Sequence, residues 1–125
     1  MIITSWNIRG LNRKGKQRHL AERLRKEKPQ LMLLQEKKIS GRKMEEILNK
    51  IKPKYECMTI DVKGSVRGIA ILWKPAKITA EYWIEMKRIL TGKFRLIGNR
   101  EWFLVLVVYD PHTPAERGIF ILQLQ

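Results

Sequence analysis

The sequence predicts an α/β (α+β) fold in which one mixed β-sheet is flanked by helices. Short apolar runs rich in β-branched residues, which are typical of buried strands, alternate near the N-terminus with segments whose apolar residues recur at helical spacing. After residue 54 the apolar runs follow one another, and no further helical pattern begins before residue 113. A strand–helix–strand start followed by a series of strands indicates a sheet with both parallel and antiparallel neighbours.

The first forty residues are predicted to form two strands joined by a helix. Residues 2–6 and 31–34 are the strands, and the helix spans residues 18–28 after a polar loop over 11–17. Pro29 ends the helix, because proline disfavours the helical conformation of the residue before it. A strand–helix–strand unit of this kind closes right-handed with its two strands parallel.

A second helix is predicted over residues 41–52, with Ser40 as its N-cap. Its apolar residues recur at the spacing of a core-facing stripe, and these are Met44, Ile47, Leu48 and Ile51. Five further strands are then predicted, over residues 55–62, 68–73, 78–86, 94–97 and 102–109. The last of these is the most apolar and is expected at a sheet centre.

A third helix is predicted to start near Thr113, which together with Glu116 forms a capping box. It would carry Ile119, Phe120 and Leu122 as its apolar residues. A capped helix with bulky apolar residues should pack on something, and the sequence ends at Gln125 before supplying all of it. We therefore expect a truncated domain.

The composition favours one domain with a polyanionic partner. The chain has 125 residues, 44% of them hydrophobic, and a formal net charge of +14. Residues 1–54 hold 16 basic and 5 acidic residues, a balance of +11, and the remainder holds 10 and 7, a balance of +3. A basic half suits a polyanion, most simply nucleic acid, through contacts to phosphate. The alternative is an ordinary solvated face rich in lysine.

Cys57 is the only cysteine, so neither an intrachain disulfide nor a cysteine-based zinc cluster is possible. The longest apolar run, residues 102–109, is too short to cross a bilayer, and no signal-peptide pattern is present. These features predict an intracellular chain without a membrane partner. They do not distinguish a nuclear from a cytoplasmic location.

Polar side chains follow the first two predicted strands at the points where these end. Asn7 follows the strand over 2–6, and Glu36 follows the strand over 31–34. The carboxyl ends of neighbouring parallel strands lie at one edge of a sheet, about 5 Å apart. Amide and carboxylate oxygens suit Mg²⁺. The alternatives are that Asn7 caps its own turn and that Glu36 is a solvated charge paired with Lys37 or Lys38.

Four stretches in order resemble the endonuclease/exonuclease/phosphatase superfamily. They are residues 4–12 (Thr-Ser-Trp-Asn-Ile-Arg-Gly-Leu-Asn), 33–38 (Leu-Leu-Gln-Glu-Lys-Lys), 68–73 (Gly-Ile-Ala-Ile-Leu-Trp) and 107–112 (Val-Val-Tyr-Asp-Pro-His). The sequences of the first and third stretches are most similar to the endonuclease domain of non-LTR (LINE-type) retrotransposons. The resemblance covers the whole chain but only the N-terminal part of the family domain.

The resemblance implies the N-terminal half of a four-layer αββα sandwich and divalent-metal hydrolysis of DNA phosphodiesters. Carried over residue by residue, Asn7 and Glu36 would hold Mg²⁺ or Mn²⁺, and Tyr109 would contact the scissile phosphate. Arg9, Lys38 and His112 would contact phosphate or the DNA backbone, as implied by the same match.

The sequence departs from the family pattern in several places, among them Lys37, which stands where the family usually has Thr. His112 stands where the family often has Asn, and Asp110 stands where a small residue is common. The family's Gly-Asp-Phe-Asn motif and its late Asp-His pair, which position and activate the water, do not occur by residue 125. We therefore expect residues 1–125 to form a partial domain of weak or no activity. A non-catalytic basic nucleic-acid-binding module, a decayed retroelement remnant and a phosphatase acting on lipid or nucleotide phosphates remain alternatives.

Overall fold

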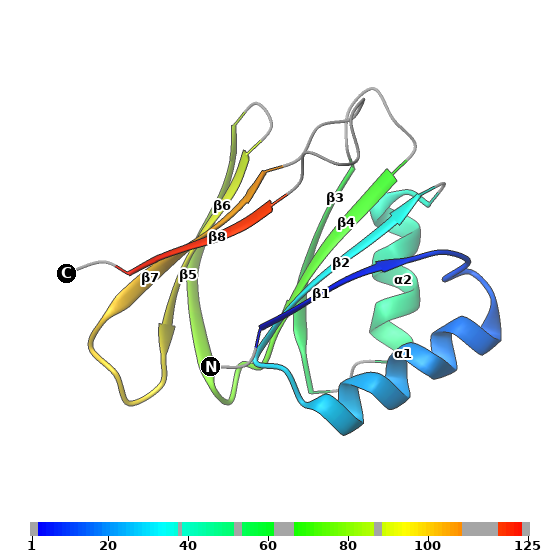
Figure 1. The fold of residues 1–125 in the computed structure, drawn as a ribbon, viewed down its shortest axis with the longest axis horizontal. Helices are drawn as coiled ribbons and strands as arrows, with labels where there is room; N and C mark the ends of the chain where they lie inside the picture. Colours follow the sequence, from blue (N-terminus) through cyan, green and yellow to red (C-terminus); the bar gives the residue numbers. More distant parts are fainter. Residues whose placement is uncertain are drawn as a thin grey trace. The chain divides into compact units, whose positions relative to one another are not determined.

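The computed structural model of the chain describes residues 3–37, 39–51, 54–61, 67–86, 89–108 and 118–123 (Figure 1). It divides into two compact units, Met1–Lys74 and Pro75–Gln125. The first unit contains a mixed sheet with two helices, and the second contains an antiparallel sheet. The predicted α/β (α+β) class is confirmed.

The first unit has a four-stranded sheet in the order β1-β2-β4-β3. Its elements are β1 Ile3–Ile8, α1 Lys14–Glu27, β2 Leu31–Lys37, α2 Gly41–Ile51, β3 Glu56–Asp61 and β4 Arg67–Trp73. β1 and β2 are parallel, and the pairs β2–β4 and β3–β4 are antiparallel. The predicted strand–helix–strand unit is therefore confirmed, with its two strands as immediate neighbours.

Both helices pack on one face of this sheet (Figure 1). Alternate strand residues face them, because side chains of a strand point to opposite faces in turn. The buried core on this face contains Ile8, Met32, Leu34, Ala70 and Leu72 from the strands, Leu20 and Leu24 from α1, and Met44, Ile47 and Leu48 from α2. The apolar stripe predicted for the second helix is thus the stripe that packs on the sheet.

The bounds of α1 differ from those predicted. The helix begins at Lys14, within the stretch 11–17 predicted as a loop, and not at residue 18. A tight turn after β1 accounts for the early start: Gly10 has a φ of +78°, and the Arg13 amide donates to the Gly10 carbonyl at 2.9 Å. The helix ends with Lys28 in the left-handed conformation just before Pro29, close to the predicted end.

α2 follows its prediction closely. The amide of Lys43 donates to Oγ of Ser40 at 3.1 Å, which confirms Ser40 as the N-cap. The helix ends at Ile51, one residue before the predicted end.

The second unit is an antiparallel sheet in the order β5-β6-β7-β8, which the sequence patterns did not separate from the first sheet. Its strands are β5 Ile78–Met86, β6 Ile89–Leu96, β7 Trp102–Val108 and β8 Gly118–Gln123. β7 lies between β6 and β8, so the most apolar predicted strand does occupy an inner position. Phe94, Phe103, Val105 and Val107 are buried on one face.

The prediction of a helix that starts at Thr113 is wrong over residues 118–123, because these residues form β8. Residues 119–122 (Ile-Phe-Ile-Leu) are a continuous apolar run without helical spacing, and β8 pairs with the apolar β7 along its length. The capping-box residues 113–116 lie outside the described part of the chain.

A regular strand over residues 78–86 would place Ile78, Ala80, Tyr82, Ile84 and Met86 on one face, but the register of β5 shifts between Ala80 and Tyr82. The extra residue reverses the faces beyond it, as a β-bulge does. Trp83 therefore packs on Gly92, where a Cβ would come within 2.4 Å of the indole ring. Tyr82 is exposed, as is Met86 with 67% of its surface.

Tyr55 ties the start of β3 to the end of α1. Its hydroxyl donates to the backbone oxygen of Pro29 at 2.7 Å, and burial raises the pKa of Tyr55 to about 12. A raised pKa means that the folded state binds the phenolic proton more tightly than the unfolded state. Its contribution to stability is present below pH 10 and is lost as the pH rises through about 12.

Tyr55→Phe should lower the free energy of unfolding by about 1 kcal/mol at pH 8, because the buried carbonyl loses its donor. Between pH 8 and pH 11.5 the stability of the parent chain should fall more than that of the variant, which lacks the phenol. Urea midpoints of both proteins at the two pH values test this. A midpoint difference that does not change with pH contradicts it.

The helices that the structure describes include none that is long and apolar enough to cross a lipid bilayer.

Candidate metal and nucleic-acid site

β1 and β2 bring the backbone positions of Asn7 and Glu36 into adjacent strands. In their parallel pairing Asn7 is opposite Gln35, and Ile8 is opposite Glu36. The two predicted metal ligands are thus one register step apart, in strands that lie about 4.8 Å from each other. In this register the position of Glu36 belongs to the row of helix-facing Ile8, and the position of Asn7 belongs to the other row, with Gln35. Asn7 is the second-last residue of β1 and Glu36 the second-last of β2, so both lie at the carboxyl ends of the strands rather than just beyond them.

Several predicted site residues fall outside what the structure describes. The side chains of Asn7 and Glu36 belong to this group, so their binding of a common cation stays a prediction. Lys38, Tyr109 and His112 lie outside the described residues altogether. Arg9 is described, and it is exposed directly after β1. The structure thus places the strands that carry the site.

The loop after β1 is held tightly against the first unit. Leu11 is fully buried, and the Gly10–Arg13 hydrogen bond closes the turn that leads into α1. Exposed Arg9 therefore starts from a fixed backbone, since the residues on both sides of it are anchored by buried Ile8 and Leu11. A cation placed in this way at the end of the strand is suited to contact a phosphate of a bound nucleic acid.

Gly68 of β4 lies opposite Glu36 of β2, at a point where β4 passes close to the segment that follows β2. The two residues are paired across β2 and β4, and a Cβ on Gly68 would lie 2.9 Å from the backbone oxygen of Ile39. Only glycine fits there without a shift of the backbone. The glycine therefore lets β4 approach the segment that links the end of β2 to α2.

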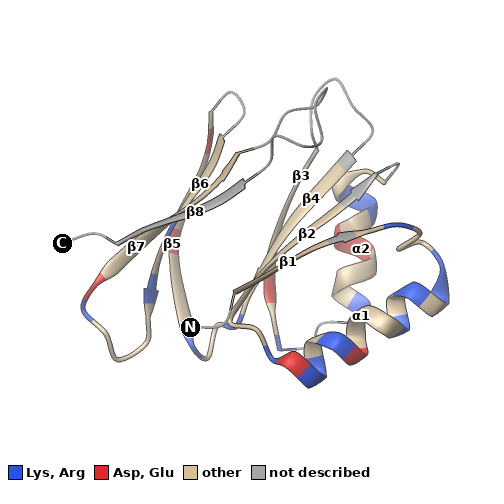
Figure 2. Ribbon diagram, viewed as in Figure 1, with Lys and Arg blue, Asp and Glu red and all other residues tan. Residues whose placement is uncertain are grey.

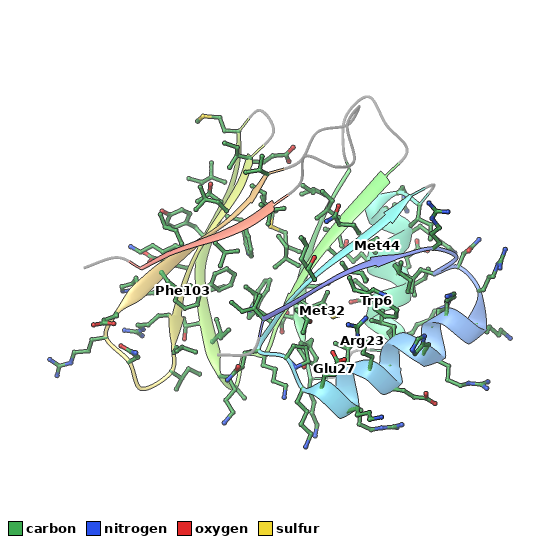
Figure 3. The ribbon with its side chains drawn as sticks, viewed as in Figure 1. Trp6, Arg23, Glu27, Met32, Met44 and Phe103 are labelled. Atoms are coloured by element: carbon green, nitrogen blue, oxygen red, sulfur yellow. The ribbon has the colours of Figure 1, made fainter. Side chains whose placement is uncertain are left out.

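A contact that the sequence patterns missed joins β1 to α1 directly before Asn7 (Figure 3). The guanidinium of Arg23 lies 4.5 Å from the centre of the Trp6 ring, and the His19 ring meets the same indole edge-on at 5.3 Å. Glu27 accepts a hydrogen bond from Nε of Arg23 at 3.1 Å. We call Trp6, His19, Arg23 and Glu27 the indole clamp. The only sequence signal for it is the i, i+4 spacing of its three helical residues.

Gln35 is the one buried polar side chain among the described residues, with 6% of its surface exposed. It pairs with Asn7 on one side and with Ile69 on the other. Sequence reasoning treated it only as a motif residue. Its backbone position is thus opposite that of Asn7 at the carboxyl ends of the two strands.

Within the described ranges no three His, Cys, Asp or Glu side chains gather as a metal cluster. The predicted site does not require such a cluster, because Mg²⁺ keeps several waters and is bound by one or two protein oxygens together with substrate phosphates. The donor chemistry of an amide and a carboxylate on neighbouring strands fits that ion.

No protein-family profile and no curated protein sequence matches the chain. Solved structures do match in fold. A humanized D. rerio TDP2 with 14 mutations matches with a TM-score of 0.59 and 14% identity, over 78% of this chain and 43% of that one. A functionally unknown conserved protein from Enterococcus faecalis V583 matches with a TM-score of 0.63 and 16% identity, over 91% and 54%.

TDP2 from C. elegans matches with a TM-score of 0.52 and 14% identity, over 95% of this chain and 33% of that one. The chain thus spans between about a third and about half of the length of these structures. At such low identity the likeness shows the fold alone. The fold of this chain is therefore shared, over the matched part, with these TDP2 structures.

Proposed function

We propose that the chain is part of a divalent-metal phosphodiesterase that nicks DNA, of the kind found in LINE-type retrotransposons. The observation that supports this most directly is the parallel pairing of β1 and β2, which puts the positions of Asn7 and Glu36 in adjacent strands. The likeness in fold to TDP2 structures and the motif order in the sequence agree with it.

In this proposal Asn7 and Glu36 hold Mg²⁺ or Mn²⁺, and the bound ion would polarise the phosphoryl oxygen and stabilise the charge that develops on it. Tyr109 contacts the scissile phosphate, and Arg9, Lys38 and His112 contact phosphate or the DNA backbone. Water oxygen then forms a bond to phosphorus in line with the P–O bond that breaks, and the departing oxygen takes up a proton. We propose that the protein acts on DNA inside the cell.

A supercoiled-plasmid nicking assay tests the proposal. Nicking by the 125-residue chain should depend on Mg²⁺ and should fall at least 100-fold in Glu36→Gln, because the substitution removes the charged ligand and keeps the size. The matched control is Glu45→Gln, which removes an exposed carboxylate of α2 and should leave the rate unchanged. Equal rates in the parent chain and Glu36→Gln would contradict the proposal.

The activity of the chain is expected to be weak, so metal binding should be measured as well. Mn²⁺ added to ¹⁵N-labelled protein should broaden the amide signals of residues 7–10 and 35–37 in the parent chain and in Glu45→Gln. The same signals should stay sharp in Glu36→Gln. If these amides are unaffected by Mn²⁺ in the parent chain, the two strands do not form a metal site.

The uneven charge of the sequence favours a second candidate, a non-catalytic nucleic-acid-binding module. Residues 1–54 carry a balance of +11 against +3 for the rest. The same assays separate the two functions. A non-catalytic module binds DNA in a salt-dependent way and shows no Mg²⁺-dependent nicking. Its Glu36→Gln variant binds DNA as tightly as the parent chain does.

A further inference from the structure

Of the two helices of the first unit, α1 carries the larger positive charge (Figure 2). The helix has 14 residues, of which six are Lys or Arg and two are Glu. α2 has 11 residues with three basic and two acidic ones. The balance is therefore +4 on α1 and +1 on α2, although the two helices pack on the same face of the sheet. α1 thus supplies +4 of the +11 balance of residues 1–54, more than α2 does, and the remaining +6 lies outside the two helices.

The cations of the two helices also differ in their partners. On α2, Arg42 and Lys43 both approach the carboxylate of Glu46, at 4.0 and 3.8 Å. On α1, Arg23 is paired with Glu27 in the indole clamp. For Lys14, Arg18 and Arg25 no ion pair is recorded with any other described residue, and all three are exposed. These three cations are therefore available to an outside anion.

Lys14, Arg18 and Arg25 share one side of α1. Their separations of four and seven residues correspond to about one and about two helical turns, so the three side chains leave the helix in nearly the same direction. At about 1.5 Å per residue they extend over about 16 Å. We call these three residues the α1 stripe. Leu20 and Leu24, which are buried against the sheet, leave the helix in a different direction and hold it in place.

The length of the α1 stripe matches a run of nucleic-acid phosphates. A strand of a B-form duplex presents one phosphate per about 3.4 Å along its axis, so 16 Å corresponds to about five steps. The first turn of α1 contains no acidic residue, so no carboxylate there offsets Lys14. A straight helix with three aligned, exposed cations is thus suited to lie along a phosphate backbone without reading the bases.

We propose that the α1 stripe binds the phosphate backbone of double-stranded DNA, at a surface separate from the predicted metal site at the ends of β1 and β2. The choice of DNA over another polyanion rests on the proposed nuclease function, whereas the position of the surface rests on the charges and spacing of α1. The stripe holds the duplex by charge and leaves the chemistry to the residues at the strand ends.

Fluorescence anisotropy of a labelled 20-bp duplex against salt concentration tests the proposal. The variant Lys14→Gln/Arg18→Gln/Arg25→Gln removes the stripe. The matched control Arg42→Gln/Lys43→Gln/Lys50→Gln removes the same charge from α2. The slope of log K against log salt should be smaller by about 2.7 in the stripe variant, at about 0.9 per lost phosphate contact. The control should change it by less than 1, and affinity near 0.1 M salt should fall more than tenfold only in the stripe variant.

Circular dichroism should first show that both triple variants keep the helical signal of the parent chain. Equal changes of slope in the two variants would show a general charge effect and would overturn the proposal. The measurement is repeated with heparin in place of the duplex. If the two triple variants differ in slope with heparin as much as they do with the duplex, the assignment to DNA is overturned. The variant Glu36→Gln separates this proposal from the nuclease proposal. If the nuclease proposal fails but the α1 stripe binds DNA, the slope of log K against log salt is the same in Glu36→Gln and in the parent chain. The slope of the stripe variant still differs from both.

Discussion

Phe94→Ala should lower the free energy of unfolding of the second unit by about 4 kcal/mol, within the range for buried aromatic residues replaced by alanine. Phe94 is fully buried on β6, an inner strand of its sheet. Its ring meets that of Trp83 edge-on at 4.9 Å and stacks on that of Phe103 at 5.8 Å. Since the described part of this unit is a sheet without helices, these three rings form a large share of its apolar packing.

Amide hydrogen exchange followed on peptides that cover residues 78–108 measures this loss, because exchange reports the stability of each segment separately. Ile97→Ala is the matched control, since Ile97 is 56% exposed and its truncation should cost less than 1 kcal/mol. A loss below 1 kcal/mol for Phe94→Ala, or equal losses for both variants, would show that the three rings do not hold the sheet together.

The strand–helix–strand start of the fold could be predicted because its signals are local. Apolar runs of strand length, helical spacing and a terminating proline all lie within 36 residues. The handedness rule for such units then made β1 and β2 parallel. What the sequence did not contain was the exact register, in which Asn7 is opposite Gln35 and not opposite Glu36. Register depends on how the two strands pack on the helices.

β8 shows where local signals mislead. Thr113 and Glu116 form a good capping box, and a capping box predicts a helix from a few neighbouring residues. The strand over Gly118–Gln123 forms instead because β7 offers it a complete apolar partner, from Val108↔Gly118 to Phe103↔Gln123. Pairing of this kind is a tertiary effect that overrides local preference.

The register shift in β5 was hidden for a similar reason. Regular alternation holds up to Ala80, but one added residue reverses every face beyond it. The signal that was present is the pair of Trp83 and Gly92, which lie opposite each other in β5 and β6. A strand glycine covered by an aromatic ring is recognisable only when the pairing is known.

The candidate site was predictable to the extent that topology determines it. Adjacent parallel strands follow from the sequence pattern, and they carry Asn7 and Glu36. The indole clamp was not predictable, because the contact between Trp6 and Arg23 depends on the direction in which α1 crosses β1. Buried Gln35 was missed because a polar residue at the end of an apolar run gives no sign of its burial.

Trp6→Ala should lower the free energy of unfolding of the first unit by about 3 kcal/mol. Trp6 is half-buried and packs against the core between the sheet and the helices. Removal of the indole leaves a cavity there, and it also ends the cation–π contact with Arg23, which is worth about 0.5 to 1 kcal/mol in such a setting. Because Asn7 follows Trp6 in the same strand, the loss should also loosen the carboxyl end of β1.

Urea unfolding measures the total loss, and hydrogen exchange of residues 14–27 shows whether α1 is the segment released. Two controls divide the effect. Arg23→Gln removes the cation and its ion pair with Glu27 but keeps the indole, so it should cost less than about 1 kcal/mol. Trp6→Phe keeps an apolar ring and should retain most of the stability. If Arg23→Gln costs as much as Trp6→Ala, the clamp acts through charge and the packing of the indole is secondary.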